Sequence, residues 1–179
     1  LYKDFELLQN QIEEGNEIEP KFFLPIIPTV LLNGSSGIAV GFATNILNRN
    51  PLDLVDACLR VISGKKPGQL LPWWSEYSGP VSQVESTNQY VMRGSYRVAN
   101  TTTVEISELP PSITFQKYEA HLNTLQDRGI IQSYEDNSSD GVNYTLKFTR
   151  TALADLIAKG RLDQTLKMVE TETENLTCL

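Results

Sequence analysis

The stretch that decides the fold is residues 25–46, PIIPTVLLNGSSGIAVGFATNI, which joins a proline-stiffened apolar run to a segment of small residues. Pro25 and Pro28 lack a backbone donor and hold the residues before them in an extended conformation. Residues 33–41 are rich in glycine and serine and carry one isolated isoleucine, Ile38. Taken alone, they predict a tight structural turn, because glycine usually marks special backbone torsions.

A second interpretation of the same segment is a nucleotide site. An apolar run that leads into a Gly/Ser loop is how many phosphate-binding loops begin. Gly34, Gly37 and Gly41 fit neither G-x-G-x-x-G nor G-x-x-x-x-G-K-[ST], and no lysine follows the last glycine. A nucleotide-binding α/β domain that uses residues 33–41 therefore stays a less favoured alternative.

Five further motifs accompany this stretch. They are Leu1-Tyr2-Lys3, Glu19-Pro20, Pro72-Trp73-Trp74, Ile106-Ser107-Glu108-Leu109-Pro110 and Leu176-Thr177-Cys178-Leu179. In this order they resemble the DNA-cleavage subunit of type II DNA topoisomerases, the subunit that corresponds to the A subunit of gyrase. The chain is most similar to the phage-type separate (medium) subunit, because residues 33–41 follow the bacterial gyrase pattern and the motifs at 72–74 and 108–110 follow the eukaryotic one.

The resemblance implies an α+β fold and a central fragment of that subunit. Residues 1–67 are expected to be the end of a winged-helix region with the isoleucine loop and the helix after it. The composition changes at Gly68, where turn-rich sequence is followed by alternating strand patterns. Residues 68–179 are expected to be an antiparallel-sheet-plus-helices tower, or shoulder, domain that is truncated before the coiled coil.

The resemblance also implies a function. In this family the nucleophilic tyrosine precedes the Leu-Tyr-Lys segment, so it is expected upstream of Leu1, and Tyr2 is not a candidate. The parent enzyme breaks both strands of a duplex, passes a second duplex through and reseals the first, with Mg²⁺ and ATP bound by partner subunits. This fragment is expected to be inactive alone. Its expected partners are double-stranded DNA, a second copy of the full-length subunit in a homodimer, and the ATPase/Toprim subunit, in the cytoplasm of a bacterium or phage-infected host.

The resemblance assigns DNA intercalation to Ile38. Small neighbours suit this role, because an apolar wedge must enter a base step without other side chains striking the backbone. Phosphate contacts are expected from nearby donors, and Lys65 and Lys66 follow the next helix. The predicted DNA-binding residues are Asn33, Ser35, Ser36, Thr44, Asn45, Arg49, Asn50, Lys65 and Lys66. Gyrase-type sequences have proline at Leu47 and histidine at Arg49, and capping of a helix is the alternative role of Asn50.

The net charge of −7 is unusual for a DNA-binding protein. Residues 20–100 carry +3, whereas residues 1–19 and 101–179 carry −5 each. The basic part coincides with the part that carries the motifs, so the charge distribution is compatible with one DNA-facing surface that has acidic flanks. Ordinary solvated charge, or a protein-interaction module with an acidic face, is the alternative.

Local patterns predict the secondary structure. Helices are expected at 4–14, after Asn50-Pro51, after Thr114 and at 152–159 with Thr151 as cap. Strands are expected at 81–84, 90–98, 103–106, 130–134 and 144–148, with Glu170, Glu172 and Glu174 on the outer face of another. Because the strands cluster, the sheet is expected to be antiparallel.

The remaining candidates for chemistry are few. His121 lies within a predicted helix and is the only histidine of the sequence, so a metal site or a Ser/His/Asp triad built on it lacks partners. A helix-surface role is favoured, and no metal site is predicted. Trp73 and Trp74 are expected to anchor packing after a proline. Cys58 and Cys178 fit a reducing compartment, and the apolar run 22–32 is too short to cross a bilayer.

Overall fold

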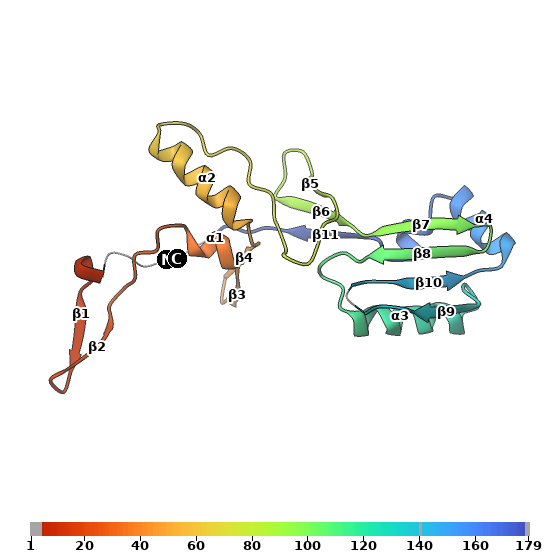
Figure 1. Ribbon diagram of the computed structural model, residues 1–179, viewed down its shortest axis with the longest axis horizontal. Coiled ribbons are helices and arrows are strands. Elements are labelled where there is room, and N and C mark those ends of the chain that lie inside the picture. The colour runs from red at the N-terminus through yellow and green to blue at the C-terminus, as the bar shows by residue number, and fades with distance from the viewer. Residues whose placement is uncertain (1–4, 140, 178–179) are drawn as a thin grey trace. The chain divides into compact units, whose positions relative to one another are not determined.

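The computed structural model describes residues 5–139 and 141–177 (Figure 1). The motif at residues 1–3, Asp4 and Cys178 lie outside the described residues. The chain divides into two compact units, one formed by Leu1–Pro72 with Asn175–Leu179 and the other by Trp73–Glu174. The sequence places its boundary between residues 67 and 68, and it gives no sign that the chain returns to the first unit at Asn175.

The first unit consists of two hairpins and two helices in its described part. Its elements are the 3₁₀ turn η1 (Phe5–Leu7), strands β1 (Asn10–Glu13) and β2 (Asn16–Pro20), helix α1 (Thr29–Asn33), strands β3 (Ser35–Ala39) and β4 (Phe42–Ile46), and helix α2 (Pro51–Ile62). β1 pairs with β2 and β3 pairs with β4, both antiparallel.

The helix predicted at 4–14 is wrong. Glu13 pairs with Asn16, and the two residues between them, Glu14 and Gly15, have φ angles of 50° and 83°. Positive φ at both loop positions is the type I′ geometry that matches the twist of a hairpin. Ile12, one of the apolar residues whose spacing suggested a helix that stops at Gly15, lies exposed on β1. The glycine expected to stop a helix is instead the second residue of a turn.

Helix α2 forms as predicted. The Asn50 side chain accepts a hydrogen bond from the Leu52 amide at 2.8 Å, Pro51 occupies the first turn, and Gly64 follows with a φ of +73°. The sequence predicts an apolar stripe of this helix, and the structure leaves it exposed: its residues are Leu52, Val55, Leu59 and Ile62. The helix buries Leu54 and Ala57 instead. Periodicity identifies an apolar face but does not say what covers it.

The second unit contains two antiparallel sheets. One has the strand order β7-β8-β10-β9 and the other the order β11-β6-β5. The strands are β5 (Val81–Gln83), β6 (Gln89–Arg93), β7 (Ser95–Asn100), β8 (Thr103–Glu108), β9 (Ser133–Asp136), β10 (Tyr144–Lys147) and β11 (Val169–Thr173). The helices are α3 (Phe115–Asp127), α4 (Arg150–Ala158) and α5 (Leu162–Thr165).

The core of the second unit lies between the four-stranded sheet and its helices. α3 is capped by Thr114, as predicted, and buries Tyr118, Leu122 and Leu125. These side chains join a cluster that includes Val104 of β8 and Leu146 of β10. α4 begins two residues earlier than predicted, because the hydroxyl of Thr149, not that of Thr151, accepts from the Ala152 amide at 3.2 Å.

Two buried tyrosines in this core allow a direct comparison. Their ring centroids are 5.3 Å apart, and the Tyr118 hydroxyl donates to the Leu166 carbonyl at 3.1 Å. The Tyr144 hydroxyl has no hydrogen-bond partner among the described residues. Burial raises the pKa of Tyr144 to about 12.

We therefore expect Tyr144→Phe to change the free energy of unfolding by less than about 0.5 kcal/mol, or to raise it. Tyr118→Phe, the matched variant, should lower it by about 1 kcal/mol because a buried carbonyl loses its donor. Urea denaturation followed by tryptophan fluorescence measures both. An equal loss in the two variants would show that the Tyr144 hydroxyl is bonded after all.

The strand predicted at 90–98 is divided at Gly94 into β6 and β7, which belong to different sheets. A Cβ at Gly94 would lie 2.6 Å from the Glu108 carbonyl oxygen, so no larger residue fits without a backbone shift. The Gly94 amide donates to the Met168 carbonyl at 2.8 Å. The alternating pattern continues through this position, which is why the sequence predicts one strand.

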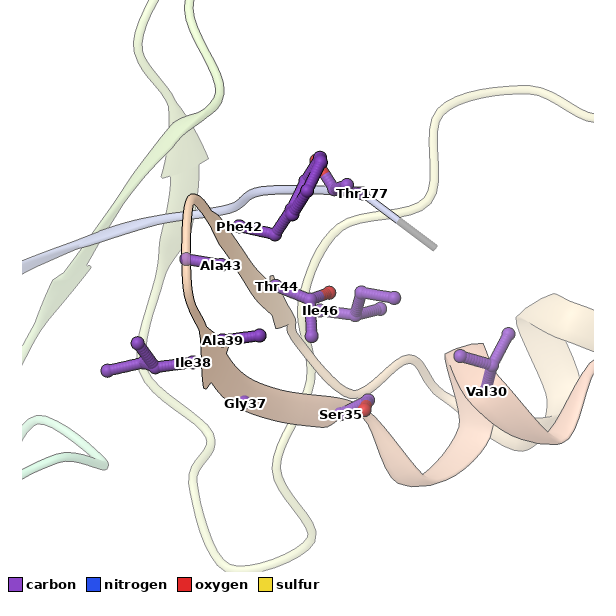
Figure 2. Close-up of a pocket in the computed structure, with 10 residues that line it drawn as sticks. All are labelled: Val30, Ser35, Gly37, Ile38, Ala39, Phe42, Ala43, Thr44, Ile46 and Thr177. Atoms are coloured by element: carbon purple, nitrogen blue, oxygen red, sulfur yellow. The ribbon is translucent and has the colours of Figure 1, made fainter. Parts of the chain in front are cut away.

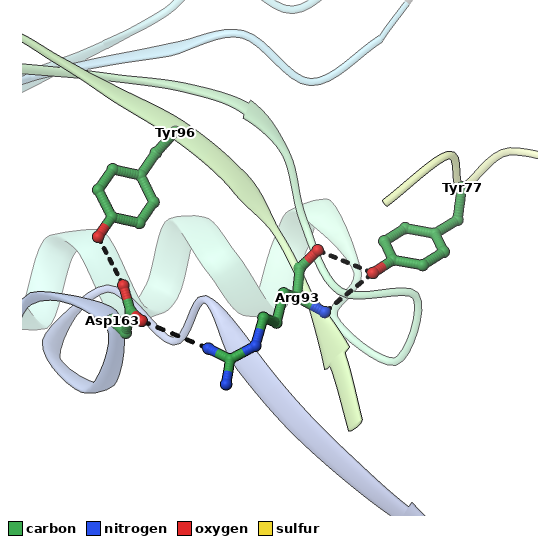
Figure 3. A network of polar contacts seen from close by, with 4 residues as sticks. All are labelled: Tyr77, Arg93, Tyr96 and Asp163. Carbon is green, nitrogen blue, oxygen red and sulfur yellow. Dashed lines mark hydrogen bonds and ion pairs between the residues drawn. The ribbon is translucent and has the colours of Figure 1, made fainter. Parts of the chain in front are cut away.

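Polar contacts stabilise the chain on both sides of Gly94, where β6 ends and β7 begins (Figure 3). The Tyr77 hydroxyl accepts from the Arg93 amide at 2.9 Å and donates to the Arg93 carbonyl at 2.7 Å. Asp163 accepts from the Tyr96 hydroxyl at 2.5 Å, and its other oxygen lies 3.5 Å from the Arg93 guanidinium. Burial, and to a smaller extent the hydrogen bond to Asp163, raises the pKa of Tyr96 to about 12. The contacts therefore connect β6, β7 and α5.

Other residues singled out in the second unit have structural roles. Trp73 and Trp74 are half-buried, and Trp74 packs edge-on against Tyr77. His121 is half-buried with Nε2 2.9 Å from the Thr165 carbonyl oxygen, and burial lowers its pKa. The three glutamates predicted on an outer strand face are not exposed: Glu170 and Glu172 of β11 are half-buried, and Glu174, which follows it, is buried. Thr171 and Thr173 are the exposed residues of this strand.

Candidate nucleic-acid interface

The segment predicted as a Gly/Ser loop is a β-hairpin. Residues 35–39 pair in register with residues 42–46, so that Ile38 lies opposite Ala43 and Ala39 opposite Phe42. Val40 and Gly41 form the two-residue turn, with a φ of +81° at Gly41. Sequence reasoning missed these strands because glycine and serine are poor strand formers. The turn, and not the strand propensity of the residues, sets the pairing of the two strands.

The tip of this hairpin is apolar and unusually exposed. Residues 37–43 include no polar side chain. Ile38 is 93% exposed and Val40 is fully exposed, while Phe42 is more than half exposed. Ile38 is therefore not a core residue of the described structure. Exposed apolar side chains on a narrow two-stranded ribbon are suited to insertion into another molecule.

The two faces of the hairpin differ. Ile38 points away from the side on which Ala39, Thr44 and Ile46 lie (Figure 2). A pocket of about 370 Å³ lies against the hairpin and is lined by residues of both faces. Its lining residues are Val30, Ser35, Gly37, Ile38, Ala39, Phe42, Ala43, Thr44, Ile46 and Thr177. The pocket thus includes one residue from the end of the described chain, Thr177, next to the hairpin.

A close backbone contact fixes the base of the hairpin. Gly34 follows α1 with a φ of +68°, and a Cβ there would lie 2.6 Å from the Ile46 carbonyl oxygen. Only glycine suits this position, because it needs both a left-handed torsion and a close approach. Asn33, Ser35 and Ser36 lie beside it with exposed side chains that can face solvent or a ligand.

Two of the predicted phosphate donors also have structural contacts. The Thr44 hydroxyl donates to the Asn175 carbonyl at 3.3 Å. The Asn45 backbone exchanges two hydrogen bonds with the Asn175 backbone, at 3.0 and 2.9 Å. Both side chains are half-buried. Sequence reasoning missed Asn175, and no sequence spacing could reveal it, since it lies about 130 positions after the hairpin.

Arg49 has a different environment from the one predicted. It is 5% exposed. Its Nε donates to the Leu70 carbonyl at 2.9 Å, and one terminal nitrogen donates to the Leu47 carbonyl at 2.7 Å. The guanidinium therefore joins the segment after β4 to the segment before Pro72, where Arg49 and Pro72 also form an isolated bridge. The phosphate contact of Arg49 stays a prediction, and these bonds give the guanidinium a structural role.

The remaining predicted residues lie on α2 and just after it. Asn50 caps the helix, as its alternative role requires, and that hydrogen bond occupies its side-chain oxygen. Lys65 and Lys66 follow the helix and are exposed. The Lys66 carbonyl accepts from Arg60 at 3.1 Å, which fixes the backbone of this basic turn.

Two other kinds of site find no support in the described structure. The Gly/Ser segment leads into β4 and not into a helix N-terminus, so the arrangement of a phosphate-binding loop is absent from residues 33–46. Among residues 5–139 and 141–177, no three His, Cys, Asp or Glu side chains converge as metal ligands. In the same residues, no helix is long and apolar enough to span a membrane.

Comparison with known proteins decides the family. The model of the family that comprises the A subunits of DNA gyrase/topoisomerase IV matches residues 2–179. The chain belongs to this family. DNA topoisomerase 2 of Drosophila melanogaster is 34% identical over 152 residues, which are 81% of this chain and 10% of that protein. DNA topoisomerase 2 of Acanthamoeba polyphaga mimivirus is 32% identical over 136 residues, covering 76% of this chain and 11% of that protein.

The fold agrees with this family. The topoisomerase II DNA-binding, cleavage and re-ligation domain of Plasmodium falciparum superimposes with a TM-score of 0.84 and 32% identity. The superposition covers 95% of this chain and 24% of that one. The chain has the mixed α/β fold of that domain, and it spans about a tenth of the length of the curated relatives named above.

Proposed function

We propose that this chain is the DNA-binding and DNA-bending central part of a type II topoisomerase. The observation that supports the proposal is the apolar tip of the β3–β4 hairpin, with Ile38 almost entirely exposed in a chain of this family. In this proposal residues 1–67 are the end of a winged-helix region, and residues 68–179 are a tower domain. The whole enzyme is of the phage type and acts on DNA in the cytoplasm.

The mechanism proposed for this chain is mechanical. The Ile38 side chain enters a base step and kinks the duplex. Unstacking costs a few kcal/mol per step, which added phosphate contacts must offset. Asn33, Ser35 and Ser36 are exposed at the base of the hairpin, and Lys65 and Lys66 are exposed after α2, so these groups can supply such contacts.

Bond breakage is proposed to occur elsewhere in the enzyme. The nucleophilic tyrosine is proposed to precede Leu1, Mg²⁺ and ATP to be bound by an ATPase/Toprim subunit, and two full-length copies of the cleavage subunit to form a homodimer. When bound there, Mg²⁺ would support strand cleavage and ATP would drive strand passage. The described residues of this chain hold and bend the segment that is cut.

Salt dependence tests the proposal. Neutralising phosphates releases counterions, so duplex affinity should fall steeply as salt is raised from about 50 to 200 mM. Fluorescence anisotropy with a labelled duplex measures this for the 179-residue chain. An interaction module would show no duplex affinity at any salt. A nucleotide-binding domain would instead show protection of residues 33–41 from proteolysis by nucleotide.

The chain alone is expected to be catalytically silent. Incubation with supercoiled plasmid, Mg²⁺ and ATP should leave the distribution of topoisomers unchanged on an agarose gel. The intact enzyme, run in parallel, is the positive control. Relaxation by the chain alone would contradict the placement of the nucleophile outside it.

A further inference from the structure

A residue near the end of the described chain, Asn175, forms an isolated antiparallel bridge with the hairpin at Asn45. The Asn45 amide donates to the Asn175 carbonyl at 3.0 Å, and the Asn175 amide donates back to the Asn45 carbonyl at 2.9 Å. A two-stranded ribbon is marginally stable in water by itself. The contact at Asn175 covers the β4 edge of the ribbon and supplies part of the support that it lacks.

The Asn175 side chain makes a second, more specific contact. Its Nδ2 donates to the Ala43 carbonyl at 2.6 Å, and its Oδ1 accepts from the Thr177 hydroxyl at 2.7 Å. The carbonyl can only accept, so the amide nitrogen must face Ala43 and the amide oxygen must face Thr177. The Ala43 carbonyl therefore determines which way the amide is turned, and the Thr177 hydroxyl, which can donate or accept, donates to the amide oxygen.

Ala43 is the residue directly opposite Ile38 in the hairpin. Because Asn45 turns its amide and carbonyl toward Asn175, and Ala43 lies two residues away, the Ala43 carbonyl also faces outward from the ribbon. The Ile38–Ala43 pair is thus one in which the strands exchange no hydrogen bonds and the side chains lie close together. Asn175 holds the backbone of the strand at the level of the exposed isoleucine.

We propose that Asn175 is a positioning residue for Ile38, an inference that rests on the proposed function. It fixes the hairpin so that the isoleucine resists the force of the closing base step. Unstacking opposes the wedge by a few kcal/mol, and a ribbon that yields would let the base pairs restack. Asn175 need not touch DNA for this role, since it acts through the Ala43 carbonyl.

The test uses two sets of variants in the intact enzyme. Asn175→Asp keeps the shape of the side chain but removes the donor to Ala43. Thr177→Val removes the hydroxyl that orients Asn175, and Thr177→Ser restores it. Three quantities are measured: duplex affinity, bending by end-to-end energy transfer, and the fluorescence of 2-aminopurine placed at the kinked step, which reports unstacking.

We expect Asn175→Asp and Thr177→Val to reduce bending and the 2-aminopurine signal at least about twofold, with duplex affinity changed less than about threefold. Thr177→Ser should restore both signals. Affinity that falls in step with bending would indicate general unfolding and overturn the inference. Wild-type bending by both variants would also overturn the inference. The proposed function would still stand in that case if Ile38→Ala abolishes bending. Bending that survives Ile38→Ala would remove the wedge role of Ile38 from the proposed function, and with it the role of Asn175.

Discussion

Replacing Ile38 with alanine in the intact enzyme is expected to remove most of the DNA bend while leaving duplex affinity within about tenfold of the wild-type value. Side chains that wedge into base steps kink DNA by about 20–90°, and an alanine side chain is too short to fill the step. Affinity depends mainly on phosphate contacts, which this substitution leaves in place. End-to-end energy transfer on a doubly labelled duplex, with Mg²⁺ and the partner subunit present, measures the bend.

The exposed position of Ile38 allows its effect on DNA bending to be separated from effects on stability. The side chain is 93% exposed, so its truncation should change the free energy of unfolding by less than about 0.5 kcal/mol. Val40→Ala is the matched control, because Val40 is an equally exposed apolar residue of the same hairpin. Ile38→Leu should keep the bend. If Ile38→Ala bends DNA like the wild type, the isoleucine is not the wedge.

Local signals in the sequence predicted the helices that begin with a capping residue. Asn50-Pro51 and Thr114 each mark a helix start, and both caps form. These predictions succeed because a cap depends on a few neighbouring residues. The helix predicted at 4–14 failed for the complementary reason. Three apolar residues at helical spacing are weak evidence when the turn at Glu14 and Gly15 favours a hairpin.

Contacts between distant residues could not be predicted from one sequence. The division of the 90–98 run depends on the Glu108 carbonyl that lies against Gly94, and the support of the β3–β4 hairpin depends on Asn175. Neither partner is near in sequence. The resemblance to a family supplied Ile38 as a candidate, and the structure adds that this side chain is exposed on a hairpin tip.

Arg49 shows that residue type alone does not predict the environment of a side chain. An arginine in a segment rich in polar donors predicts a phosphate contact, because most basic side chains lie on the surface. Here the backbone around it turns the guanidinium inward, toward the carbonyls of Leu47 and Leu70. A buried arginine that donates to carbonyl groups stabilises the fold, and the predicted phosphate contact of Arg49 stays a prediction beside this structural role.

Replacing Arg49 with alanine is expected to lower the free energy of unfolding of the first unit by about 3 kcal/mol, because buried carbonyls lose their charged donor. Arg49→Lys should be nearly as damaging, since one ammonium cannot reproduce the planar fork of donors. Arg60→Ala is the matched control: Arg60 is exposed, and its loss should cost less than about 0.5 kcal/mol. Hydrogen exchange of the α2 amides measures stability in this unit, which has no tryptophan.

The same variants separate a structural arginine from a phosphate contact. Each lost phosphate contact should reduce the slope of log affinity against log salt by about 0.9. We expect that reduction for Lys65→Gln and Lys66→Gln, whose side chains are exposed, and not for the folded fraction of Arg49→Lys. If Arg49→Ala instead lowers the salt slope and leaves hydrogen exchange unchanged, the guanidinium must leave its buried position when DNA binds. The interface would then extend from the hairpin tip to the start of α2, and Arg49 would belong to it as the sequence predicted.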